Sequence, residues 1–368
     1  MRRARTPGDA DGGPDASCAV QHDQIVTAVD WAPKTNKIVT SSQDRNSYVW
    51  SKEDGGSGEW KPTLVLLRLT RAATCVRWSP NGDKFAVGSG EKSVCICQFM
   101  EEFGAGGGWT SKSIRKCPIS QKSIKSTVLS VAWHPNNCFL VVGCADMKCR
   151  VFNAYLKNVD GRTPPAGAFG LNPAEKKLKF GACIAEYPQS KGWVHDAAFN
   201  PSGTGLAFVG HDSSLHFATV PTEAPALQSL PMVADESTVV TIKLKGLPFK
   251  AVAFIDDTKL IAGGHDAMPA YFTADGGAWE YKGCVDKPTA AKSAKKSGGG
   301  VSAARNMWQN KADLGSETAN AGSKMDSLHQ NAISGLEVMD GGSFSTCAYD
   351  GRLVVWDMAC LESAVPLK

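Results

Sequence analysis

Twelve cysteines and seven histidines are the side chains of this 368-residue sequence best suited to metal binding or nucleophilic catalysis. No two cysteines form a CxxC pair, and the closest spacings are Cys95 to Cys97 and Cys144 to Cys149. Thiols at alternate positions of a strand share one face, where small core residues are more common than metal ligands. This many unpatterned cysteines therefore indicates core packing in a reducing, cytosolic compartment.

The histidines show no catalytic or metal-binding spacing. No HExxH motif occurs, and the His-Asp pairs at 211–212 and 265–266 recur at equivalent turns, so we interpret them as turn residues. The glycine-rich segment 103–109 has Trp109 where a GxGxxG motif needs its last glycine, and it lacks the ending of a P-loop. We expect no metal, no cofactor and no catalytic residue, and we predict that the protein is not an enzyme.

One run of basic residues contains no acidic residue. It consists of Lys112, Arg115, Lys116, Lys122 and Lys125. It is either the solvated surface of an outer strand and loop, or a positive field that attracts an acidic partner. Nucleic acid is a weaker candidate, because Trp109 is the one aromatic residue near the run and the net charge of the chain is only +4.

Composition indicates a globular protein with a sizeable core. The sequence is 42% hydrophobic and contains 37 glycines and 10 tryptophans, which suits many short strands joined by turns. No apolar run approaches the roughly 20 residues that span a bilayer. Residues 1–20 begin with basic residues and continue with Gly, Asp and Pro, so we expect a disordered N-terminal tail without a secretion signal.

The elements that position these residues form a repeat with six copies. Each copy begins with an alternating strand that ends on a large residue: VTAVDW (26–31), ATCVRW (73–78), VLSVAW (128–133), VHDAAF (194–199), FKAVAF (249–254) and ISGLEV (333–338). A turn, a small apolar strand, a turn with an acidic residue and a third strand follow. Most copies have room for a fourth strand, for example at 239–245. The pattern predicts an all-β, WD40-type β-propeller of four-stranded repeats over residues 21–365.

Two sets of repeat residues are predicted to be structural. The acidic residues cap the second turn with their own side chains, and this set includes Asp44, Asp146, Asp212, Asp266 and Asp350. The large residues at the ends of strands fill the space between neighbouring blades, and this set includes Trp31, Trp50, Trp78, Trp133 and Trp356.

The interval between the last two copies contains an insert, residues 286–328. Its first half is basic and glycine-rich, which is typical of a flexible linker. In the segment 301–311, Val301, Ala304 and Trp308 lie at i, i+3 and i+7, with Met307 beside them, which predicts a short helix with one apolar face. This helix either docks in the groove of a partner or folds back onto its own propeller.

The two ends of the repeat array differ from a complete ring. Only 25 residues precede the first copy, whereas a blade needs about 40. The stretch after Asp357 indicates a short helical tail and not a fourth strand. We therefore expect the first blade and the closing strand to be missing, through a truncated N-terminus or a variant isoform.

Several segments resemble the WD-repeat subunit 1 family of the actin-related protein 2/3 complex. They include DWAPKTNKIVTSSQDRNSYVW, RAATCVRWSPNGDKFAVGSGEKSVCIC, GWVHDAAFNPSG, GHDAMPAYF and MDSLHQNAISGLEV, and the resemblance covers about residues 22 to 365. It includes loops as well as blade residues, so it is more specific than a general WD40 match.

The resemblance implies a seven-bladed family pattern and a function. It implies a non-catalytic scaffold in a complex that nucleates branched actin filaments in the cytoplasm, within the actin cytoskeleton. The implied partners are actin-related protein 2, the small subunits of the complex, the actin filament and nucleation-promoting factors. The acidic tail of a nucleation-promoting factor would be complementary to the basic run. The insert would contact actin through residues that match the family motif, namely Arg305, Met307, Trp308, Gln309 and Asn310. The alternative is a different WD40 adaptor, for example one that presents substrates to a ubiquitin ligase.

Overall fold

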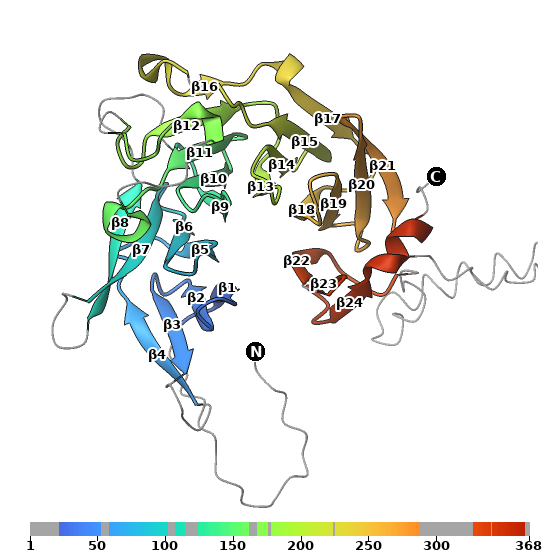
Figure 1. Ribbon diagram of the computed structural model, residues 1–368. Coiled ribbons are helices and arrows are strands. Elements are labelled where there is room, and N and C mark those ends of the chain that lie inside the picture. The colour runs from blue at the N-terminus through green and yellow to red at the C-terminus, as the bar shows by residue number, and fades with distance from the viewer. Residues whose placement is uncertain are drawn as a thin grey trace, which may run out of the picture.

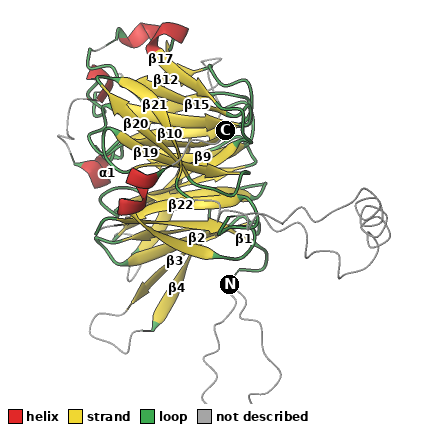
Figure 2. Cartoon of the chain, turned by 90° about the vertical axis from the view of Figure 1, so that its right-hand side faces the viewer, coloured by secondary structure: helices red, strands yellow, loops and turns green. Residues whose placement is uncertain are grey.

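The computed structural model describes residues 22–52, 59–101, 107–114, 124–161, 168–175, 178–223, 225–286, 327–339 and 341–364. Six sheets follow one another around an arc, with the first strand of each sheet on the inside (Figure 1). Seen from the side, the strands run across the thickness of a disc (Figure 2). This confirms the propeller class. The predicted tail 1–20 and helix 301–311 lie outside the described residues.

The first three sheets contain the first twelve strands. Sheet 1 consists of β1 (Val26–Ala32), β2 (Lys37–Ser42), β3 (Ser47–Lys52) and β4 (Trp60–Val65). Sheet 2 consists of β5 (Ala73–Trp78), β6 (Lys84–Ser89), β7 (Val94–Met100) and β8 (Gly108–Ile114). Sheet 3 consists of β9 (Val128–Trp133), β10 (Phe139–Cys144), β11 (Cys149–Asn153) and β12 (Cys183–Tyr187), and β16 (Met232–Val233) is added in parallel to β12.

The other three sheets complete the arc. Sheet 4 consists of β13 (Val194–Phe199), β14 (Gly205–Gly210), β15 (Ser214–Thr219) and β17 (Val239–Lys243). Sheet 5 consists of β18 (Phe249–Phe254), β19 (Lys259–Gly264), β20 (Ala270–Asp275) and β21 (Ala278–Cys284). Sheet 6 consists of β22 (Ile333–Met339), β23 (Ser343–Ala348) and β24 (Leu353–Asp357).

In the part of the chain that the structure describes, the helices are short and peripheral. They are α1 (Lys157–Asp160) and the 3-10 helices η1 (Ala168–Gly170), η2 (Leu227–Ser229), η3 (Glu236–Thr238) and η6 (Met358–Ser363). The sixth copy therefore differs from the four-stranded prediction: within the described residues it has three strands, and η6 follows β24 directly.

Every first strand carries a β-bulge near its beginning. In β1, for example, the register against β2 shifts between Val26 and Ala28, so Thr27 has no direct partner. The same shift recurs in the other five sheets. The six residues without a register partner are Thr27, Thr74, Leu129, His195, Lys250 and Ser334. A bulge adds one residue and redirects a side chain, and here it does so at one level of the ring.

Five apolar cores lie between consecutive sheets, one at each of the five interfaces. At the first interface, Trp78 and Phe85 of sheet 2 pack with Val39 and Val49 of sheet 1. Trp78 is 6% exposed and its ring lies 5.1 Å from that of Phe85. The residue at the end of each first strand thus faces the preceding sheet, and burial of this apolar surface holds neighbouring sheets together.

Trp31 differs from the predicted role of a residue that fills the space between blades. Trp31 occupies the same repeat position near the end of β1 as Trp78 does at the end of β5, yet it is 57% exposed. The reason is its position in the arc: it faces away from sheet 2, toward the opening between sheets 1 and 6.

The two tryptophans form a matched pair for a stability measurement. We expect Trp78→Ala to lower the free energy of unfolding by about 3–5 kcal/mol, because it leaves a cavity between two sheets. Trp31→Ala should change it by less than about 1 kcal/mol, because that side chain is largely solvated. Urea denaturation followed by circular dichroism measures both values. Equal losses for the two variants would contradict this account of sheet packing.

Candidate functional site: the central channel

The first strands of all six sheets line a central channel. The six bulge residues lie along one cavity of about 610 Å³ at one end of the channel. The fifth residues of the same strands line an adjoining cavity of about 310 Å³, and these are Asp30, Arg77, Ala132, Ala198, Ala253 and Glu337. One short repeat sequence therefore determines which side chains face the channel at each depth.

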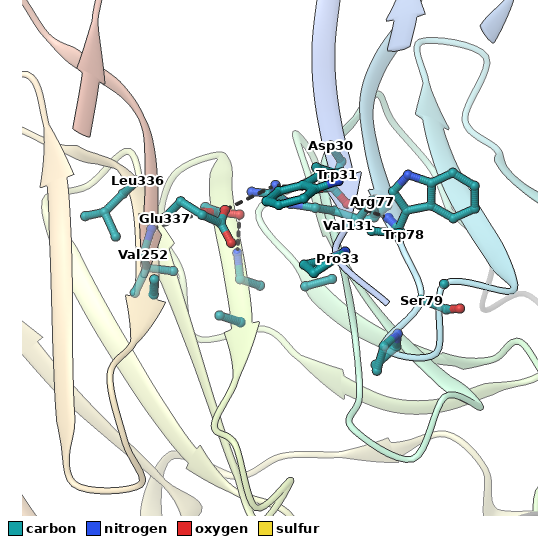
Figure 3. Close-up of a pocket in the computed structure, with 18 of the residues that line it drawn as sticks. Asp30, Trp31, Pro33, Arg77, Trp78, Ser79, Val131, Val252, Leu336 and Glu337 are labelled. Atoms are coloured by element: carbon teal, nitrogen blue, oxygen red, sulfur yellow. Dashed lines mark hydrogen bonds and ion pairs between the residues drawn. The ribbon is translucent and has the colours of Figure 1, made fainter. Parts of the chain in front are cut away.

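Arg77 is the central charged group of the smaller cavity (Figure 3). Its guanidinium lies 3.1 Å from a carboxylate oxygen of Asp30 and 3.6 Å from one of Glu337. Asp30 also accepts a hydrogen bond from the backbone N–H of Trp78 at 2.6 Å. Burial raises the pKa of Asp30, although Arg77 and this N–H partly offset the effect. Arg77 thus connects sheets 1, 2 and 6 across the opening.

Asp196 faces the channel from sheet 4. It accepts the backbone N–H of Val252 at 3.0 Å and so ties sheet 4 to sheet 5. Burial raises the pKa of Asp196 to about 6, although Arg77 and the Val252 N–H act in the opposite direction. A carboxyl with this pKa has the acidity of a general acid or base. Its two oxygens, however, bond the backbone of Ala197 and Val252, which indicates a structural use.

The end of the channel that the bulge residues line carries cations and imidazoles. His195 Nε2 lies 2.8 Å from His211 Nδ1, and Lys250 donates to the Tyr349 hydroxyl at 2.8 Å. Burial lowers the pKa of His195 to about 4, and the neighbouring His211 and Lys250 lower it further. The contacts of His195 are thus with other bases and not with a carboxylate that would orient it for catalysis.

Two sheets contain a network of His, Asp, Thr and Trp. In sheet 1, His22 contacts Asp44 at 2.7 Å and Thr40 at 2.8 Å, and the Trp50 indole donates to Thr40 at 3.1 Å. In sheet 6, His329 Nε2 lies 2.7 Å from the Thr346 hydroxyl and the Trp356 indole donates to Thr346 at 2.8 Å, whereas His329 Nδ1 is 3.5 Å from Asp350 and makes no hydrogen bond. These networks join the loop before a sheet to its second and third strands.

The turn acids do more than cap their own turns. Asp44 accepts the N–H of Asn46 at 2.9 Å within the turn, and it also accepts the N–H of Asp23 at 3.2 Å. Burial alone would raise the pKa of Asp44, but the hydrogen bonds from Asn46 and His22 lower it. Asp212, Asp266 and Asp350 likewise accept an N–H from the loop before their sheet. Asp146 differs, because it pairs with Arg150 at 2.9 Å.

Trp78, Trp133 and Trp356 lie between packed sheets, as predicted. Trp50 does not, because it is in register with Ile38 and Trp31 on the face of sheet 1 that points away from sheet 2. Trp133 and Trp356 are 8% and 7% exposed, and Trp50 is half-buried. The Trp133 indole donates to the Arg77 carbonyl at 3.1 Å, which joins sheet 3 to sheet 2.

Two members of the basic run lie on the described surface. Lys112 is on the outer strand β8, with its ammonium 4.2 Å from the ring centre of Phe180, and Lys125 is exposed before β9. Residues outside the description are Arg115, Lys116 and Lys122 of the run and Val301, Ala304, Arg305, Met307, Trp308, Gln309 and Asn310 of the insert.

Metal-ligand and nucleophile chemistry is not supported by the described part of the chain. It has no group of three or more His, Cys, Asp or Glu side chains placed to hold a metal ion. Burial raises the pKa of Cys75 to about 11 and that of Cys138 to about 12, so these thiols are poor nucleophiles at neutral pH. None of the described helices is long and apolar enough to cross a membrane.

The six sheets, the inner-strand channel and the two hydrogen-bonded networks define a WD40 propeller. In agreement, the sequence matches the family described as "WD domain, G-beta repeat" over residues 17–51, 67–97 and 116–153. Relatives that match along nearly the whole chain identify a narrower family. Actin-related protein 2/3 complex subunit 1 of Schizosaccharomyces pombe is 39% identical over 368 residues, which cover 95% of this chain and 89% of the relative.

Two further relatives agree. Subunit 1A-B of Xenopus laevis is 39% identical over 353 residues, covering 94% of this chain and 85% of the relative. Subunit 1B of Arabidopsis thaliana is 39% identical over 349 residues, covering 93% and 84%. The chain therefore belongs to the family of actin-related protein 2/3 complex subunit 1.

The raised pKa of Asp196 predicts a pH dependence of stability. Its folded-state pKa of about 6 is above the ordinary aspartate value of 3.8, so the stability that it contributes is present at low pH and lost as pH rises through about 6. The free energy of unfolding of the wild type, relative to Asp196→Asn, should fall between pH 4.5 and 7.5 by at most about 3 kcal/mol. Urea titrations at the two pH values measure this.

Asp256→Asn is the control: burial alone would raise the pKa of Asp256, but hydrogen bonds from Thr258 lower it, so its contribution changes only at more acidic pH. The difference between wild type and this variant should therefore stay constant from pH 4.5 to 7.5. A constant difference for Asp196→Asn as well would contradict the assignment.

Proposed function

We propose that this chain is the propeller subunit of an actin-related protein 2/3 complex and acts there as a non-catalytic scaffold for nucleating branched actin filaments. The observation that carries the proposal is similarity to subunit 1 proteins along 93–95% of the chain. The channel supports a scaffold role, because Asp30 and Asp196 are used for hydrogen bonds between neighbouring sheets.

The proposed partners follow from membership of such a complex. They are actin-related protein 2, the small subunits, the actin filament and nucleation-promoting factors, and the proposed location is the cytoplasm, within the actin cytoskeleton. The exposed Lys112 and Lys125 support an acidic partner, such as the acidic tail of a promoting factor. A general WD40 adaptor, for example for a ubiquitin ligase, would have the same propeller fold, but this alternative does not account for the similarity to subunit 1 proteins.

Assembly is the direct test of this function. A tagged full-length chain, expressed in cells of its own species, should co-purify with both actin-related proteins and the small subunits in near-equal amounts. Quantitative mass spectrometry of the purified material measures this, and Trp78→Ala, which weakens the frame, should reduce the yield of all partners together. Recovery of ubiquitin-ligase components without actin-related proteins would favour the adaptor instead.

The insert gives a more specific prediction. Trp308→Ala should reduce branch formation by the assembled complex several-fold, because an aromatic anchor at an interface contributes about 2 kcal/mol or more. Microscopy of branching filaments measures the rate. Trp193→Ala is the control, because Trp193 is a 54%-exposed tryptophan outside the insert, and it should leave branching unchanged. Equal rates for wild type and Trp308→Ala would refute the predicted actin contact.

A further inference from the structure

Three imidazoles and one ammonium group lie together on sheets 4 and 5, at the end of the channel that the bulge residues line. His195 on β13 faces His211 on the turn after β14, and Nε2 of the first ring is 2.8 Å from Nδ1 of the second. The ring of His265, on the equivalent turn after β19, lies 6.2 Å from the ring of His211. Lys250 on β18 lines the same cavity as His195. We call these four side chains the basic cluster.

Lys250 carries a positive charge that no carboxylate of the described residues pairs with. Its ammonium donates to the Tyr349 hydroxyl at 2.8 Å and lies 4.7 Å from the centre of that ring, and both contacts are with neutral groups. Burial lowers the pKa of His195, and the three other members of the cluster lower it further through their positive charge. The cluster therefore disfavours additional positive charge and favours an incoming anion.

The aspartates that follow the three histidines in the sequence are already hydrogen-bonded elsewhere. Asp212 accepts the backbone N–H of Lys191 at 3.0 Å, and Asp266 accepts that of Leu247 at 2.8 Å. Asp196 accepts two backbone N–H groups, at 2.9 and 3.0 Å. These oxygens fix loops and neighbouring strands, so an anion from outside the described chain is needed to pair with the basic cluster.

Two exposed apolar side chains flank the basic cluster. Leu247 is 55% exposed in the loop before β18, and Tyr349 is 61% exposed on the turn after β23. A free anion makes no use of these side chains. A short protein segment contacts them and also enters the cavity that His195 and Lys250 line, whereas a flat bilayer surface does not. Their position therefore favours an anion that lies between apolar side chains of a protein.

The number and arrangement of donors favour a phosphate over a carboxylate. A phosphate monoester has a charge of about −1.5 to −2 at pH 7 and three acceptor oxygens. The donors of the basic cluster come from two strands and two turns and surround a site from several directions, which suits a tetrahedral group. Each imidazole supplies an N–H donor even when it is neutral.

We propose that the basic cluster binds the phosphate of a phosphorylated serine or threonine in a partner protein, with Leu247 and Tyr349 contacting apolar side chains next to the phosphorylated residue. This proposal does not depend on assembly with actin-related proteins, so the two can fail separately.

Three labelled peptides of one sequence are the probes. Each has Leu on both sides of a central residue, which is phosphoserine, Ser or Glu. Fluorescence anisotropy with the purified full-length chain should show the phosphoserine peptide binding about tenfold more tightly than the Ser peptide and several-fold more tightly than the Glu peptide. Inorganic phosphate should displace it only at a much higher concentration, because it lacks the apolar contacts.

Three outcomes of this competition would overturn the proposal. Equal affinity for the phosphoserine and Glu peptides would indicate a site for carboxylates. Displacement by inorganic phosphate at a concentration equal to that of the peptide would indicate a site for free phosphate. Displacement by vesicles that contain a phosphorylated inositol lipid, at the same phosphate concentration, would indicate a lipid headgroup.

Two lysines form a matched pair for the charge. Lys250→Met should weaken binding of the phosphoserine peptide about tenfold and leave the Ser peptide unaffected, whereas Lys250→Arg should keep most of the affinity. Lys52→Met is the control, because Lys52 also lies over an aromatic ring, 5.1 Å from that of Trp60 in sheet 1. It should bind as the wild type does. Equal losses for Lys250→Met and Lys52→Met, with circular dichroism showing both folded, would mean that only the general positive field attracts the peptide, and the site would be refuted.

Discussion

Packing of each sheet against the sheet before it is the interaction on which the rest of the structure depends. An isolated antiparallel sheet is stable only when its apolar side chains are packed against another element. Trp78 and Phe85 on Val39 and Val49 illustrate the solution, which recurs at five interfaces. The arc and the channel at its centre both follow from repeating this one contact.

Side-chain periodicity predicted the strands because a period of two is visible in a short sequence. The expected fourth strand at 239–245, for instance, corresponds to β17 at Val239–Lys243. The bulges were not predicted, because VTAVDW alternates equally well with or without an extra residue. They matter for the channel, since the shift at Val26 and Ala28 and its five counterparts place one residue of each first strand along the cavity at one end.

The hydrogen-bonded networks were missed for a different reason. His22 and His329 precede the acids that they contact by more than twenty residues, and in the sequence they lie outside the alternating strands. Local spacing carries no sign of such a contact. A signal was available in the repeat itself: each histidine precedes a Thr by 17 or 18 residues and a Trp ten residues further on, so aligning the first copy with the last would have paired them.

The charged residues of the channel stabilise the contacts between neighbouring sheets. Asp30 and Asp196 each accept the N–H of a residue in the following sheet, so two of the interfaces have a polar clamp beside the apolar core. Burial makes these carboxylates costly to ionise, and Arg77 offsets that cost while also reaching Glu337 across the opening. A guanidinium shared among carboxylates holds the ends of the arc weakly, because Glu337 is largely solvated and such pairs contribute little.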